Sequence, residues 1–153
     1  MQRDVTVEQV QKAVSLAKSS GIKTGMFLMW GYLGEEIEDI EATVEHVKKT
    51  DPDVFFTTIS YPIKGTPYFD DVARQLVPLH SWAGGSDRDY RIRGRHSRRF
   101  YQSADQLLRN EVELSRLLNG SGAMIDPVVV TELQGKIARA REVLRATGAE
   151  VEA

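Results

Sequence analysis

The sequence has 153 residues, of which 41% are hydrophobic and 27% are charged, and its formal net charge is −2. This length suffices for one domain with a buried core, and the near-neutral charge favours neither nucleic acid nor an acidic membrane surface. No apolar run approaches the roughly 20 residues that cross a bilayer, and the first residues lack the apolar stretch of a signal peptide. We therefore expect a cytoplasmic protein that does not bind membranes.

Cysteine is absent, and there are only three histidines. Disulfides, a thiolate nucleophile, a Cys-ligated zinc site and a Cys-bound iron–sulfur cluster are therefore excluded within these residues. His46, His80 and His96 are too scattered along the sequence to suggest a metal site. We expect no cofactor to be held by this chain alone.

The first part of the chain predicts a helix, a strand, a second helix and a second strand. Apolar residues recur at helical spacing over residues 6–20. Residues 24–30 and 54–60 are short apolar or β-branched runs, typical of parallel strands that are covered on both faces. Between them, residues 35–49 are acidic at the start and basic at the end, as the helix dipole favours. This order predicts an α/β fold with a parallel sheet, but two strands alone indicate an incomplete fold.

The second part of the chain is mainly helical in pattern. We expect a short helix over residues 68–76, a loop over residues 78–85 and a long helix over residues 97–118. Asp126 as N-cap, with proline at the first helical position, predicts a last helix over residues 127–147.

Two segments resemble radical S-adenosylmethionine enzymes. They are residues 20–36 (SGIKTGMFLMWGYLGEE) and residues 61–70 (YPIKGTPYFD). In that family, a Gly-Ile leads into an apolar fifth barrel strand that ends in a Gly-x-Pro-Gly-Glu-Thr turn, and a sixth strand ends in a Tyr-Pro and Gly-Thr-Pro exit. The similarity covers about residues 1–72 and is nearest to the subgroup with a cobalamin-binding domain. Leu33 and Glu36 depart from the family turn, which has proline and threonine there.

The resemblance implies a fragment of a (β/α)₆ partial TIM barrel, comprising its last two parallel strands and their helices. We accordingly divide the chain into residues 1–76 (barrel portion), 77–96 (Arg-rich connecting loop) and 97–153 (helical hairpin). The family's Cys-x-x-x-Cys-x-x-Cys loop would lie upstream, so the expected partner is the missing N-terminal half of the barrel. The parent enzyme would be an Fe–S oxidoreductase that uses S-adenosylmethionine, a four-iron four-sulfur cluster and, as in the nearest subgroup, cobalamin. The chain alone would be inactive.

The resemblance also implies a set of cofactor-binding residues at two strand ends, which would form the adenine side of the S-adenosylmethionine site: Met29, Gly31, Gly34, Glu35, Ser60, Tyr61 and Pro62. Most of these residues have a purely structural alternative. Met29 could be a core residue, the glycines ordinary turn formers and Glu35 a helix cap. Tyr61-Pro62 could simply end a strand.

An arginine-rich segment lies between residues 87 and 99. Its arginines are Arg88, Arg91, Arg93, Arg95, Arg98 and Arg99. With neighbouring aromatic residues, they could bind phosphates or bases. We favour a solvated face whose arginines pair with the acidic residues 35–45 over nucleic-acid binding. His80 and Trp82 lie in a loop that either packs or meets substrate.

Two alternatives to the enzyme fragment therefore remain. One is a stand-alone module that binds protein or nucleic acid through the arginine-rich segment and the helical hairpin. The other is a half-barrel that forms a homodimer through its exposed sheet edge, since an unpaired strand edge promotes association.

Overall fold

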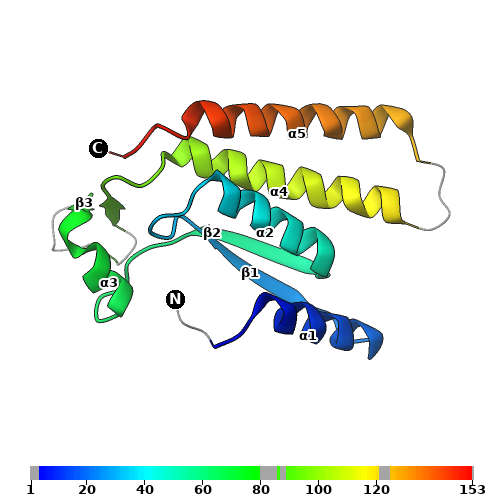
Figure 1. Ribbon diagram of the computed structural model, residues 1–153, viewed down its shortest axis with the longest axis horizontal. Coiled ribbons are helices and arrows are strands. Elements are labelled where there is room, and N and C mark those ends of the chain that lie inside the picture. The colour runs from blue at the N-terminus through cyan, green and yellow to red at the C-terminus, as the bar shows by residue number, and fades with distance from the viewer. Residues whose placement is uncertain (1–3, 80–85, 87–88, 121–124, 153) are drawn as a thin grey trace.

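The structure is a computed structural model that describes residues 4–79, 86, 89–120 and 125–152 (Figure 1). His80, Trp82 and Arg88 lie outside the described residues. The elements, in chain order, are α1 (Val7–Ser19), β1 (Gly25–Trp30), α2 (Ile37–Thr50), β2 (Val54–Ile59), α3 (Pro67–Val72), a 3₁₀ turn (Ala73–Gln75), β3 (Leu76–Pro78), β4 (Tyr90–Ile92), α4 (Arg98–Asn119) and α5 (Pro127–Thr147). The class is mixed α/β, as the sequence predicts.

Strands β1 and β2 form a parallel pair, which confirms the predicted pairing. Gly25 lies opposite Val54, and Trp30 lies opposite Ile59. Helix α2 makes the crossover between them. Asp51 ends this helix in the left-handed region with a φ of 42°. Because the two strands are parallel, both direct their carboxyl ends toward the same edge of the sheet.

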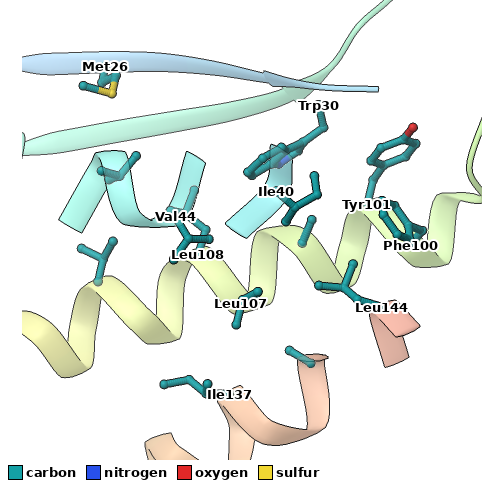
Figure 2. Close-up of a cluster of buried hydrophobic side chains, with 14 residues drawn as sticks. Met26, Trp30, Ile40, Val44, Phe100, Tyr101, Leu107, Leu108, Ile137 and Leu144 are labelled. Carbon is teal, nitrogen blue, oxygen red and sulfur yellow. The ribbon is translucent and has the colours of Figure 1, made fainter. Parts of the chain in front are cut away.

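The hydrophobic core lies on one side of this sheet. Figure 1 shows α2, α4 and α5 stacked in that order away from the strands. Trp30 points from β1 toward Ile40 of α2. On α4, Leu108 lies beside Val44 of α2, whereas Leu107 points toward α5 (Figure 2). These side chains are almost completely buried, so the helices and one face of the sheet form a single core.

The opposite face of the sheet is open. Phe27 of β1 is 83% exposed, and its ring stacks on Phe56 of β2 with the ring centroids 5.3 Å apart. Val54 and Met29 lie on the same face and are also exposed. The cover on two faces that the apolar runs indicate is therefore present on only one face in the described part of this chain. The apolar runs reflect burial on one face and an uncovered apolar surface on the other.

A small antiparallel pair was not predicted. Leu76 of β3 lies opposite Ile92 of β4, so the helix expected over residues 68–76 ends early, at Val72, and gives way to the 3₁₀ turn and β3. Each strand has only three residues, and this is too short to show a period of two. The arginines around β4 also hide its strand character, because long charged side chains are not typical of buried strands.

The predicted helical hairpin is confirmed. Helices α4 and α5 begin and end within about one residue of the expected positions, and Asp126 accepts a hydrogen bond from the Val128 amide at 2.8 Å. Arg141 of α5 contacts Glu41 of α2 at 2.8 Å and Glu111 of α4 at 2.7 Å. An ion cluster thus joins three helices.

No helix within the described ranges is long and apolar enough to cross a bilayer.

Candidate cofactor site at the strand carboxyl ends

Gly31 is the centre of a hydrogen-bond network where β1 ends. Its amide donates to Oε2 of Glu35 at 2.7 Å, and its carbonyl accepts from the hydroxyl of Ser60. Its φ is +75°, and a Cβ at this position would lie only 3.2 Å from side-chain atoms of Arg95 and Tyr101. The backbone conformation requires glycine here, and a Cβ would also press against the side chains of Arg95 and Tyr101. The sequence predicts Gly31 as a turn glycine, and the positive φ explains this. The sequence does not predict that Arg95 and Tyr101 lie beside it.

Glu35 is half-buried in this network. Burial raises the pKa of its carboxyl group to about 7, while the hydrogen bond from Gly31 opposes the shift and the nearby Asp39 carboxylate adds to it. Glu35 does not cap α2. The N-cap is Glu36, whose amide donates to Asp39 at 2.9 Å. The helix-cap interpretation of Glu35 is therefore wrong, because its carboxylate turns back to the end of β1.

Ser60 connects the ends of the two strands. Its amide donates to the Trp30 carbonyl at 2.7 Å, and its own carbonyl accepts from Nη1 of Arg95 at 2.7 Å. Ser60 and Pro62 are buried and Tyr61 is half-buried. The structure therefore brings Gly31, Glu35 and Ser60 together.

Met29 and Gly34 lie outside this network. Met29 is 45% exposed on the open face of the sheet, so it is not the core residue of the alternative interpretation. Gly34 is exposed in the turn with a φ of +80°, and a Cβ added there would meet no other described atom within 4 Å. Only the backbone conformation at Gly34 therefore requires glycine.

Three further residues belong to the site but were not assigned to it by the sequence. Nε2 of His96 lies 3.1 Å from the Glu35 carbonyl, and its ring stacks on Phe100. Tyr101 is buried beside Gly31, and burial, followed by the Glu35 carboxylate, raises the pKa of its phenol. Arg95 approaches from the arginine-rich segment. Of these three residues, only Arg95 belongs to a sequence feature that we considered for binding, the arginine-rich segment. We interpreted that segment as a solvated face.

A cavity of about 280 Å³ lies against this network. The turn after β1, Tyr68, Arg95, His96 and Val151 line it. The chain segment after α5 closes one side, since the Glu152 amide donates to the Arg95 carbonyl at 2.7 Å. The cavity therefore depends on contacts between the turn after β1 and residues more than 100 positions later in the sequence.

The arginine-rich segment does not pair with the acidic residues 35–45 in the expected way. Of its arginines, Arg95 contacts Glu152 at 3.7 Å. Glu41 instead contacts Arg141, and His96 rather than an arginine approaches Glu36, at 3.6 Å. No ion pair between an arginine of this segment and residues 35–45 is found in the part of the chain that the structure describes.

The described residues contain no group of three His, Cys, Asp or Glu side chains that could hold a metal ion. Comparison with protein-family models and with curated proteins gives no match. The function therefore has to be inferred from the residues and their geometry.

Proposed function

We propose that this chain is the C-terminal part of a radical S-adenosylmethionine enzyme and supplies the adenine side of its S-adenosylmethionine site. The observation that carries the proposal is the open sheet face. A parallel β–α–β unit with helices on one side and exposed Phe27, Phe56 and Met29 on the other has the arrangement of a barrel wall. The apolar open face would be the inner side of a partial TIM barrel whose remaining strands come from elsewhere.

The strand ends fit an adenine ring. The thioether of Met29 is accessible on the open face, and polarizable sulfur packs well against an aromatic ring. The Ser60 carbonyl accepts one hydrogen bond from Arg95 and has a second lone pair for the exocyclic amine of adenine. S-adenosylmethionine, when bound, would supply a sulfonium whose reductive cleavage begins radical chemistry. The role of this chain would be to bind and orient the nucleoside.

The iron–sulfur cluster does not fit this chain, because the sequence has no cysteine to ligate it. The cluster would be held by the other half of the barrel, and cobalamin, if it is used, by another part of the parent enzyme. We therefore expect the chain alone to be inactive. A brown, reconstituted protein that produces 5′-deoxyadenosine from this chain would overturn that expectation.

Methyl NMR of the methionines tests adenine binding directly. Met29 is exposed on the open face, whereas Met26 on the same strand is 9% exposed and faces the core. On titration with adenosine, the Met29 methyl signal should move upfield, because the purine ring current acts on a methyl group in contact with its face. The Met26 signal should stay in place. We expect millimolar affinity, since only one side of the site is present.

Ser60→Ala provides a matched control, because it removes the hydroxyl bonded to Gly31 but retains the Ser60 carbonyl. In this variant adenosine should still shift the Met29 signal. Unchanged Met29 signals at saturating adenosine would contradict the proposed site.

A further inference from the structure

A second cavity, of about 420 Å³, lies at the end of β2. Three arginines from three parts of the chain line it: Arg91 on β4, Arg95 in the following segment and Arg98 in the first turn of α4. The lining also includes three tyrosines, which are Tyr61, Tyr90 and Tyr101. The arginine-rich segment thus places half of its six arginines in one concavity rather than spreading all of them over a surface.

The positive charge of this cavity is only partly balanced. Among the described residues of its lining, Glu152 is the one carboxylate, and it lies 3.7 Å from Arg95. Arg95 also donates to the Ser60 carbonyl, so its guanidinium has a structural role. Arg91 and Arg98 are exposed, and no ion pair of either is found within the described ranges. The three arginines and Glu152 leave a net charge of about +2 on the lining.

The start of α4 adjoins this cavity through Arg98. Ser97 caps the helix, and its hydroxyl lies 3.4 Å from Oε2 of Glu150, so a carboxylate from the segment after α5 already lies beside the positive end of the helix dipole. The guanidinium groups that line the cavity, rather than the start of α4, therefore favour an anion there.

We infer that the cavity binds a small phosphate ester that carries a flat ring. The planar guanidinium groups of Arg91 and Arg98 match the geometry of phosphate oxygens and can donate paired hydrogen bonds. The tyrosines supply aromatic surface for the ring. The charged groups converge in one cavity and do not follow an extended groove, as single-stranded nucleic acid would require. The cavity shares Ser60 and Tyr61 with the proposed adenine site, but the phosphate contacts of Arg91 and Arg98 lie outside that site.

Calorimetric titration of the chain with phenyl phosphate tests the inference. We expect saturable binding that is tighter than the binding of inorganic phosphate, because only the ester places a ring against the tyrosines. The double variant Arg91→Ala/Arg98→Ala should bind on the order of tenfold more weakly, since two charge-assisted hydrogen-bonding groups are lost. Both arginines are exposed, so circular dichroism should show an unchanged fold.

Arg99→Ala is the matched control. Arg99 is exposed, adjoins Arg98 on α4 and does not line the cavity, so this variant should bind phenyl phosphate as the unmodified chain does. Three results would each overturn the inference. They are the absence of saturable phenyl phosphate binding, an equal loss in Arg99→Ala, and tighter binding of a single-stranded oligonucleotide than of phenyl phosphate.

Discussion

Trp30 and Phe27 lie on the same strand and face opposite sides of the sheet. Trp30 is 2% exposed in the core, whereas Phe27 is 83% exposed. Trp30→Ala should lower the free energy of unfolding by about 3–5 kcal/mol, because it leaves a large cavity. Phe27→Ala should change it by less than about 0.5 kcal/mol. Urea denaturation of both variants measures the difference. An equal loss of unfolding free energy in the two variants would show that Phe27 is buried in solution and that this face of the sheet is not open.

Glu35 should make stability depend on pH. Its carboxyl pKa is about 7 in the folded chain and 4.5 as an ordinary glutamate. Between these values the folded state binds more protons than the unfolded state, so stability should fall as pH rises from about 4.5 to about 7 and then level off. Partial exposure reduces the full effect to about 1–2 kcal/mol.

The variant Glu35→Gln should remove this part of the pH dependence, as urea denaturation at about pH 5 and about pH 7.5 would show. Glu38→Gln, an exposed change in the first turn of α2, is the control and should retain it. Identical pH profiles for the unmodified chain and Glu35→Gln would show that the carboxyl titrates normally.

Single residues of the site were predictable where the backbone conformation alone determines which amino acid fits. Gly31 and Gly34 follow a strand in a turn motif, and both have positive φ angles. His96 and Tyr101 were not predictable as site residues, because their approach to Glu35 and Gly31 depends on how the start of α4 packs at the end of β1. No local pattern contains that information.

At the scale of the helices, Arg141 holds α5 to its neighbours. It contacts Glu41 and Glu111, and the Glu111 side chain is only 10% exposed. Lys48 contacts the same Glu111 carboxylate at 2.9 Å. Arg141→Ala should therefore lower the free energy of unfolding by about 1–3 kcal/mol, because a buried carboxylate loses one of its two cations.

Thermal or urea unfolding checks this prediction, and Arg139→Ala is the control. Arg139 lies two residues away on α5, is exposed and should contribute less than about 0.5 kcal/mol. A loss at Arg139 as large as that at Arg141 would indicate a general effect of removing charge from α5 rather than the specific ion cluster.

The helices were predictable because their ends carry local signals. Thr6, Ser97 and Asp126 each accept a hydrogen bond from an amide in the first turn of the helix that follows. Strands β3 and β4 were missed because three residues provide too little pattern to show a strand period. The parallel pair was predictable from its apolar runs, but the sequence could not show which face the helices cover.

For the molecule as a whole, the open face and the free edges of β1 and β2 should promote self-association. Among the described residues, each of these strands pairs only with the other. Sedimentation velocity at increasing concentration should show association, and Phe27→Ser/Phe56→Ser should reduce it, because exposed apolar area drives contact between copies. A chain that stays monomeric at high concentration would contradict this prediction and would also weaken the case for a homodimer.

The ion cluster of Arg141 also has a kinetic consequence. Glu41 and Arg141 are 100 residues apart, whereas α4 and α5 adjoin each other through a short connection. Local contacts form faster than distant ones, since closing a longer loop costs more entropy. The α4–α5 hairpin should therefore assemble first and dock onto α2 late, after the main barrier. Contacts made that late mainly slow the reverse reaction, so the Glu41–Arg141 pair would set how long the folded molecule persists rather than how quickly it forms.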